Sequence, residues 1–319
     1  MTRPGPGAVM APLDYRRLVP LAMLEPPAVS VLPGAVSHLQ IPYAEALGWR
    51  PLRLDLHLPA AASARRHPVV VYVHGGSFLT GMPGMGPWAG LPGHGIAVAS
   101  VAYRLSGEAC FPAPVEDVRA ALAWVGAQGE RYGLDGERVA VWGSSAGGYL
   151  AAMAAVTGAT NLSTPPRLLG VSPSETESRP AAVVTHYAVT APELLREDAY
   201  QNSEAEIRGL EAIMGGFFDD SAKLLTAVAD HLGEASAMPS FLLMHGDADR
   251  RVGLGQSRRL HDALTAAGAS SELVVVPGGD HGSPHFTSEP VVARVEDFLW
   301  QSWGRSSTDR ETTEKVETP

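Results

Sequence analysis

The stretch that most constrains the fold of this chain is residues 138–150, with the sequence Arg-Val-Ala-Val-Trp-Gly-Ser-Ser-Ala-Gly-Gly-Tyr-Leu. Its apolar, β-branched start is typical of a buried strand, and the Ala-rich run at residues 150–156 is typical of a buried helix. Between the two runs, Ser145 is the central residue of a Gly-x-Ser-x-Gly pattern. Gly143 and Gly147 lack the Cβ atoms that would clash in a tight turn. The stretch therefore predicts a strand, a sharp turn at Ser145 and a helix whose N-terminus favours negative charge beside that serine.

Strands and helices are expected to alternate along most of the chain. Residues 38–41 and 52–58 are expected to form an antiparallel edge hairpin, because the second run alternates apolar and polar side chains. Further strands are expected at residues 68–73, 96–103, 181–187, 241–245 and 273–276, and further helices at residues 114–132, 256–267 and 291–300. This alternation predicts an α/β fold, with a mostly parallel central sheet of about eight strands and helices on both faces.

Several segments do not follow this alternation. Residues 1–36 are Pro-rich and are expected to form an N-terminal arm on the main domain, residues 37–303. Residues 157–179 are expected to be a long polar loop. Residues 191–239, approximately, contain helical patterns without a strand, which predicts a small helical cap inserted above the sheet. Residues 304–319 are charged and Thr-rich, which predicts a disordered tail.

The composition of the chain argues against several classes of binding partner and cofactor. The formal net charge of −10 argues against nucleic acid or an anionic membrane as a partner. The single cysteine, Cys110, rules out an intrachain disulfide and a cysteine-based zinc site, and no metal or cofactor is expected. No apolar run reaches membrane-spanning length, and residues 1–30 are broken by prolines without a continuous apolar segment. A cytoplasmic protein is therefore expected.

Polar residues with complementary chemistry follow three of the expected strands. Ser145 directly follows its own strand, two aspartates follow residues 241–245, and His281 follows residues 273–276. Because the carboxyl ends of parallel strands meet at one edge of a sheet, these groups are expected to come together. A serine hydroxyl needs a base to accept its proton, an imidazole can be that base, and a carboxylate can fix the imidazole tautomer.

Two of these roles have competing candidates. Asp249 is favoured over Asp247 because it lies two residues further from the strand end and can reach towards the following loop, whereas Asp247 could instead bond loop N–H groups. His281 is favoured over His285 as the base because it lies nearer its strand end, in a Gly-rich loop. The residue before it, Asp280, is an unusual neighbour for such a base.

A tetrahedral intermediate at Ser145 would also need hydrogen-bond donors for its oxyanion. The run His74-Gly75-Gly76-Ser77 follows a central strand, and its small residues allow backbone N–H groups to turn towards the site. The N–H groups of Gly76, Ser77 and Ala146 are the expected donors, each contributing on the order of 3 kcal/mol to transition-state stabilisation. His74 is expected to brace this loop rather than to transfer protons.

Taken together, these motifs resemble the α/β-hydrolase superfamily. Within it, the chain is similar to the esterase/lipase branch with a His-Gly-Gly motif, which includes hormone-sensitive-lipase-like and bacterial feruloyl-esterase-like enzymes. The matching segments are residues 74–78, 102–105, 111–113, 131–135, 142–148, 245–249 and 277–282.

The resemblance implies a nucleophile, an acid, a base and an oxyanion hole, which are respectively Ser145, Asp249, His281, and the set Gly76, Ser77 and Ala146. The chain departs from the family pattern at Ser77, where many members have a third glycine, and at Gly253, where a proline is frequent. Arg250 and Arg251 form an uncommonly basic pair beside the acid. None of these departures removes a catalytic group.

A serine carboxylic-ester hydrolase acting through an acyl-enzyme is the favoured function, with a small hydrophobic or aromatic ester as substrate. Candidate substrate-binding residues are Phe78, Leu79, Tyr187, Met214, Phe217 and Phe218, and Trp88, Leu194 and Leu195 are considered with them. The alternatives are an arylformamidase or other amidase, a biosynthetic acyltransferase or other tailoring enzyme, and a ligand-binding pseudo-enzyme. A homodimer is considered as the oligomeric state.

Overall fold

The computed structural model describes residues 29–46, 50–61, 63, 65–157, 165–170, 179–195, 227–233 and 238–304. The strands in these residues are β1 (Ala35–Glu45), β2 (Leu52–Pro59), β3 (His67–Val73), β4 (Ala97–Val101), β5 (Leu134–Ser144), β6 (Arg167–Leu168), β7 (Ala182–His186), β8 (Ser240–Gly246) and β9 (Ser271–Val276). The α-helices are α3 (Ala113–Gln128), α4 (Ala146–Val156), α7 (Gly255–Ala266) and α8 (Glu289–Ser302). Short 3-10 turns are η1 (Leu91–His94), η2 (Gly129–Tyr132), η4 (Pro192–Leu194), η6 (Val228–His231) and η8 (Pro284–Thr287).

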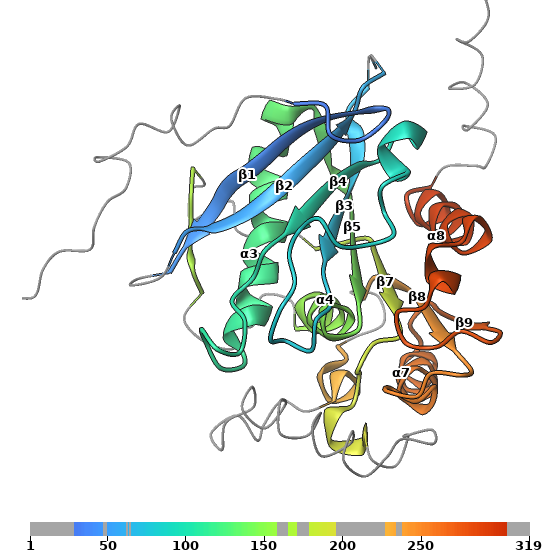
Figure 1. Cartoon of the computed structure of the whole chain (residues 1–319). Coiled ribbons are helices and arrows are strands. Elements are labelled where there is room, and N and C mark those ends of the chain that lie inside the picture. Colours follow the sequence, from blue (N-terminus) through green and yellow to red (C-terminus); the bar gives the residue numbers. More distant parts are fainter. Residues whose placement is uncertain are drawn as a thin grey trace, which may run out of the picture.

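All the described strands belong to one nine-stranded sheet with the order β6-β1-β2-β4-β3-β5-β7-β8-β9. β6, β1, β2 and β4 pair antiparallel, and every neighbouring pair from β4 to β9 is parallel. Figure 1 shows β1 and β2 towards one edge of the sheet and β9 at the other, close to α7 and α8. The mostly parallel sheet and the antiparallel hairpin expected from the sequence are confirmed.

The strand missing from the sequence prediction is β6, so the described sheet has nine strands rather than about eight. This two-residue strand pairs Leu168 with Ala44 and Arg167 with Glu45 of β1. It lies within residues 157–179, which were expected to be a loop throughout. Two residues are too few to produce an alternating pattern, so only the pairing partner defines this strand.

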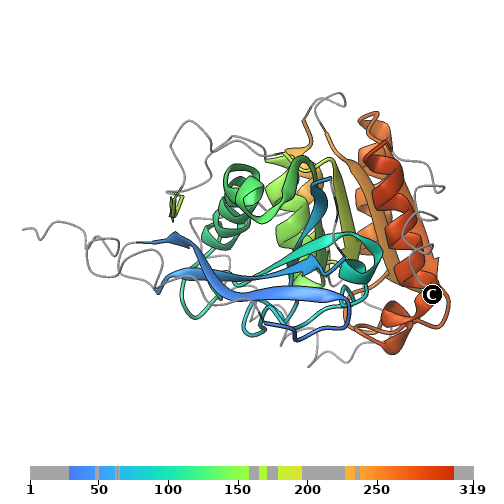
Figure 2. The same ribbon diagram turned by 90° about the horizontal axis from the view of Figure 1, so that it is seen from above.

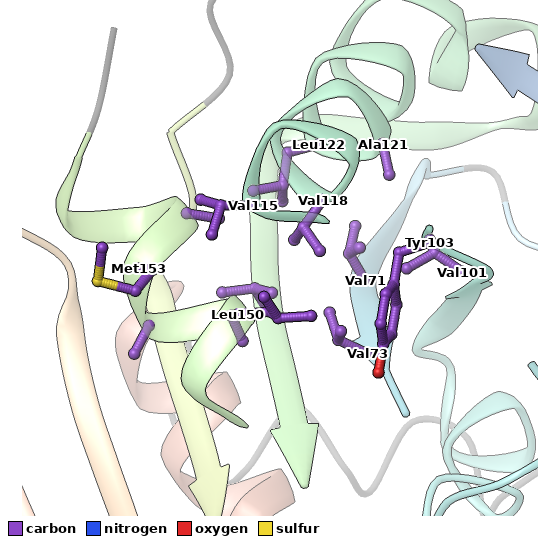
Figure 3. Close-up of a cluster of buried hydrophobic side chains, with 14 of the residues drawn as sticks. Val71, Val73, Val101, Tyr103, Val115, Val118, Ala121, Leu122, Leu150 and Met153 are labelled. Carbon is purple, nitrogen blue, oxygen red and sulfur yellow. The ribbon is translucent and has the colours of Figure 1, made fainter. Parts of the chain in front are cut away.

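The sheet is covered on both faces because its central strands are apolar on both sides. On β3, Val71 packs into one core cluster together with Val118 of α3 and Leu150 of α4, whereas Tyr72 packs into the opposite cluster with Leu299 of α8. Figure 3 shows the first cluster, with side chains of both helices directed towards the strand. Figure 2 shows α3 and α4 together on one side of the strands. Alternate side chains therefore enter separate cores, as expected for a strand buried on both faces.

Helix boundaries follow local chemistry. α4 begins at Ala146, so the residues between the turn and position 150 are helical as well. The segment expected to be one helix at 114–132 divides into α3 and the tighter η2, and Gly133 ends η2 with a left-handed backbone at φ 71°.

The parallel strands of the sheet all end at the same edge. This arrangement brings together the loops that follow β3, β5, β8 and β9.

Parts of the predicted domain organisation lie outside the described residues, namely 1–28 of the arm, 196–226 and 234–237 of the cap, and 305–319 of the tail. The first strand begins at Ala35, two residues before the expected domain boundary, and Val29 forms an isolated bridge with Ser37. Within the described ranges, no helix combines the length and apolar character needed to cross a membrane.

Candidate active site

Ser145 occupies a sharp turn between β5 and α4, with φ 55° and ψ −120°. This backbone conformation is rare for a residue with a side chain, so the surrounding structure must hold it in place. A Cβ added to Gly143 would lie 2.2 Å from the carbonyl oxygen of Gly147, and one added to Gly147 would lie 2.2 Å from that of Val73. The two glycines are therefore needed for close backbone packing. The N–H of Ser145 donates to the carbonyl of His186 at 2.9 Å, which ties the turn to β7.

A continuous line of hydrogen bonds runs from Ser145 to an aspartate. The Oγ of Ser145 lies 2.9 Å from Nε2 of His281, and Nδ1 of His281 lies 2.8 Å from Oδ2 of Asp249. These residues follow β5, β9 and β8 respectively. Because the Asp249 carboxylate accepts a hydrogen bond from Nδ1, Nε2 of the neutral imidazole is left as the acceptor that faces the Ser145 hydroxyl.

The carboxylate of Asp249 is fully buried and has several donors. Its Oδ1 accepts backbone N–H groups of Arg251 and Val252, each at 2.9 Å, and Oδ2 faces His245 at 3.4 Å in addition to His281. Burial raises the pKa of Asp249, but the hydrogen bonds from the two histidines outweigh it, and the pKa lies well below its ordinary value. Asp249 is therefore ionised at neutral pH.

The other candidates for the acid and the base are placed differently. Asp247 accepts the backbone N–H of Gly278 at 2.7 Å, so it links the loops after β8 and β9. The Nδ1 of His285 lies 3.1 Å from the hydroxyl of Ser283. It is His281 that reaches Ser145.

The loop after β3 passes directly beside the turn at Ser145. A Cβ on Gly75 would lie 2.8 Å from the carbonyl oxygen of Ser144, and Gly76 has φ 125°. Ser77 continues the unusual backbone with φ 55°. In the described part of the chain, the N–H groups of Gly76, Ser77 and Ala146 donate to no protein acceptor. Ala146 is the first residue of α4, where the N–H groups lack intrahelical partners.

His74 braces this loop from behind. Its Nδ1 lies 2.8 Å from the carbonyl oxygen of Gly75, and its ring stacks on Tyr103 with centroids 4.5 Å apart. The hydroxyl of Tyr103 donates to the carbonyl of His74 at 3.0 Å. Burial lowers the pKa of His74, which favours the neutral ring. These contacts give His74 a structural place without a link to Ser145.

The candidate substrate-binding residues are divided between core and surface. Phe78 is 1% exposed and packs edge-on against Tyr149, whereas Leu79, the next residue, is 49% exposed. The ring of Tyr187 meets the imidazole of His281 edge-on, with centroids 4.7 Å apart. Of the residues considered with them, Trp88 and Leu195 are buried and Leu194 is half-buried. Met214, Phe217 and Phe218 lie outside the described residues.

Two supporting groups were missed by reasoning from the sequence. His245 lies beneath Asp249, with Nε2 2.8 Å from the carbonyl oxygen of Val252 and Nδ1 2.7 Å from the hydroxyl of Ser257. Its position four residues before Asp249, within the matching segment 245–249, is the sequence signal for this contact. Next to Ser145 in the chain, the hydroxyl of Ser144 lies 2.9 Å from that of Tyr72. Tyr187, whose ring contacts His281, is hydrogen-bonded to the same Ser144. Burial raises the pKa of Tyr187, and this hydrogen bond lowers it in part.

The sheet order and the loops at its strand ends are those of an α/β-hydrolase, and a family match assigns the chain to the esterases of that fold. Residues 54–264 match the family model BD-FAE. The chain belongs to the BD-FAE family of α/β-hydrolase esterases.

Named relatives and a solved structure agree with this family. The chain is 29% identical to esterase LipQ of Mycobacterium tuberculosis over 88% of this chain and 66% of that protein. It is 31% identical to carboxylesterase NlhH of the same species over 69% of this chain and 67% of that protein. A truncated carbohydrate esterase from gut microbiota has the same fold, with a TM-score of 0.70, 23% identity and coverage of 88% of this chain and all of that one. The chain thus spans about two thirds of the length of these curated relatives.

Proposed function

We propose that this chain is a serine carboxylic-ester hydrolase that acts through an acyl-enzyme. The observation that carries the proposal is the continuous hydrogen-bonded line from Ser145 through His281 to Asp249 at 2.9 and 2.8 Å. Family membership supports the same reaction class, since the similar proteins LipQ and NlhH are named as an esterase and a carboxylesterase.

In the first half-reaction, the Oγ of Ser145 attacks the ester carbonyl carbon while Nε2 of His281 accepts the hydroxyl proton. The carbonyl double-bond electrons move to oxygen, and the N–H groups of Gly76, Ser77 and Ala146 stabilise the negative charge. The C–O bond to the alcohol then breaks, and His281 returns the proton to the leaving alcohol. Asp249 stabilises the transient imidazolium, because its carboxylate is ionised and already hydrogen-bonded to Nδ1.

In the second half-reaction, water replaces the alcohol. His281 accepts a proton from water as its oxygen attacks the acyl carbon, and the same donors hold the oxyanion. The bond to Ser145 breaks, the serine recovers its proton and the carboxylic acid leaves. One ester and one water thus give one acid and one alcohol.

A small ester with a hydrophobic or aromatic group is the proposed substrate. Leu79 supports this class, because it presents an exposed apolar side chain immediately after the loop with the oxyanion donors. The test is hydrolysis of aryl acetate, butyrate and benzoate esters, with matched formanilides and an added alcohol acceptor. We expect hydrolysis of the esters to dominate, and loss of activity by about 10⁴-fold or more in Ser145→Ala.

Each alternative predicts a different outcome of that assay. Faster cleavage of the formanilide would favour an arylformamidase, and transfer to the alcohol in excess of hydrolysis would favour an acyltransferase. Unchanged turnover in folded Ser145→Ala would contradict the proposed mechanism. Saturable binding of the esters without turnover would indicate a ligand-binding protein.

Two proposals concern the whole protein. A cytoplasmic location is proposed, and cell fractionation tests it. A homodimer is proposed as the oligomeric state, and light scattering on the purified protein tests it by molar mass.

A further inference from the structure

Hydrogen bonds join the loops that follow β8 and β9 at successive positions. Asp247 accepts the N–H of Gly278 at 2.7 Å, and the N–H of Ala248 donates to the carbonyl of Gly279 at 3.2 Å. A Cβ on Gly246 would lie 1.9 Å from the carbonyl oxygen of Gly279, so the two loops are in close backbone contact. This series of contacts forms a ladder between the loop that carries Asp249 and the loop that carries His281.

The outermost link of the ladder is the carboxylate of Asp280. Its Oδ1 accepts the backbone N–H of Arg250 at 3.0 Å and the backbone N–H of His281 at 2.8 Å. Its Oδ2 accepts Nε of Arg250 at 2.8 Å and is also bonded to Nη2 of the same side chain. One carboxylate therefore fixes the backbone on both loops, at the residue after Asp249 and at His281 itself.

The exposure of this link indicates that its contribution to fold stability is small. The side chain of Arg250 is 68% exposed and that of Asp280 is 30% exposed. Ion pairs at such positions contribute about 0–1 kcal/mol to stability. The Arg250 side-chain hydrogen bond, with the two backbone N–H groups, lowers the pKa of Asp280, so its carboxylate is ionised at neutral pH.

The contact of Asp280 with Arg250 matters more for the distance between the acid and the base than for the stability of the fold. Asp249 and His281 are 32 residues apart in the sequence and lie on different loops. Oδ2 of Asp249 and Nδ1 of His281 must nevertheless stay within hydrogen-bond distance, which is 2.8 Å in this structure. A shift of about 1 Å at a reacting group can lower a rate by about 100-fold. Two guanidinium N–H groups of Arg250 donate to Oδ2 while two backbone N–H groups donate to Oδ1, and four such bonds on one carboxylate restrict distance and orientation together, which a single hydrogen bond does not.

We propose that Asp280 and Arg250 are positioning residues that hold His281 on Asp249 by joining the two loops just outside the acid–base pair. This role rests on the serine esterase mechanism proposed above. It assigns a function to the two features of these loops that departed from expectation in the sequence, namely the acidic neighbour of the base and the basic neighbour of the acid.

The test compares Asp280→Ala, Asp280→Asn, Arg250→Ala and the Arg250→Ala/Asp280→Ala double variant with the wild type. The readouts are kcat and KM for an aryl ester, the rate of Ser145 labelling by a fluorophosphonate, and Tm. Arg66→Ala is the matched control, because it breaks an exposed pair with Glu130 before β3, at the opposite end of that strand from the site.

We expect kcat and the labelling rate to fall about 10–30-fold in Asp280→Ala and about 3–10-fold in Arg250→Ala, with KM changed less than about twofold. Asp280→Asn should recover part of the loss, because its amide oxygen can still accept the two backbone N–H groups. The double variant should be no slower than Asp280→Ala, since both substitutions remove one link. Tm should change no more than in Arg66→Ala.

Three results would overturn this role. Wild-type kcat in Asp280→Ala would show that the link does not position the base, and a loss of activity that follows KM or Tm would show that its role is binding or folding. Additive losses in the double variant would likewise contradict a shared link. If the wild type itself neither hydrolyses the ester nor reacts with the fluorophosphonate, the proposed function fails and the positioning role fails with it.

Discussion

The turn at Ser145 is held by backbone packed against backbone, whereas hydrogen bonds orient the side chains of Asp249 and His281 at the ends of their two loops. Around Ser145, glycines at 143 and 147 lie where any Cβ would be about 2.2 Å from a carbonyl oxygen. Around Asp249, the restraints are donors to its two carboxylate oxygens, and at the outer edge the exposed pair of Asp280 with Arg250.

This difference separates two kinds of sensitivity to mutation. Close backbone packing cannot adjust locally, so a change at the turn should affect the fold and the reaction together. A hydrogen-bonded loop can lose one link and keep the others, so changes there should lower the rate by graded amounts while the fold persists. Substitutions in the two regions test this separation.

The largest effect is expected for Gly147→Ala. The added Cβ would lie 2.2 Å from the carbonyl oxygen of Val73 and 2.3 Å from that of His74, both backbone atoms of the central strand and its loop. We expect a loss of more than about 4 kcal/mol in the free energy of unfolding, together with loss of activity. Urea denaturation measures the first. Gly90→Ala is the control, because a Cβ at Gly90 meets no described atom within 4 Å. Near-wild-type stability in Gly147→Ala would remove the distinction between the two regions.

The next effect is expected for Asp249→Asn. The amide would no longer stabilise the imidazolium and would favour the wrong tautomer of His281, so kcat should fall about 10⁴-fold while the protein stays folded. Asp247→Asn is the matched comparison in the same loop. The amide oxygen of Asn can still accept the N–H of Gly278, so this hydrogen bond is weakened and not lost. We therefore expect kcat to remain within about tenfold of the wild type. Equal losses in the two variants would contradict the assignment of the acid to Asp249.

A smaller effect is expected at low pH from His186, which borders both regions. Its carbonyl accepts the N–H of Ser145, and its buried ring packs against Trp142 and Phe286. Burial lowers the pKa of His186 from 6.5 to about 3. Between these values the unfolded chain binds a proton that the folded chain does not, so stability falls as pH falls through this window.

The contribution of His186 to this loss should be about 2 kcal/mol between pH 6.5 and pH 4.5. Urea denaturation of the wild type and His186→Leu at both pH values isolates it, because other titrating groups are common to the two proteins. The variant should lose about 2 kcal/mol less than the wild type over this interval. Parallel pH dependence in the two proteins would show that His186 does not remain neutral in the fold.

The smallest effect is expected for Leu79→Ser, which leaves both regions intact. If this exposed side chain contacts the substrate, KM for an aryl butyrate should rise about fivefold, and KM for the matching acetate should change less than about twofold. Leu79→Met should keep the wild-type preference, because it retains an apolar side chain of similar size. An unchanged ratio of the two KM values in Leu79→Ser would remove Leu79 from the substrate-binding residues.

The sequence predicts the structure best where a local pattern determines the backbone. The Gly-x-Ser-x-Gly pattern between two apolar runs predicts the turn at Ser145, and the parallel order of strands predicts that His281 and Asp249 come near it. The contact of His245 with Asp249 and the link of Asp280 to Arg250 were not predicted. They depend on how side chains of separate segments meet in three dimensions, and no periodicity in the sequence encodes such contacts.

The most direct test of the proposed mechanism is covalent labelling with a fluorophosphonate, followed by mass spectrometry of the intact protein and its peptides. We expect one adduct per chain, on the peptide that carries Ser145, with no adduct in Ser145→Ala and much slower labelling in His281→Ala, because the base that activates the hydroxyl is absent. Labelling at another residue, or labelling that persists in Ser145→Ala, would contradict Ser145 as the nucleophile.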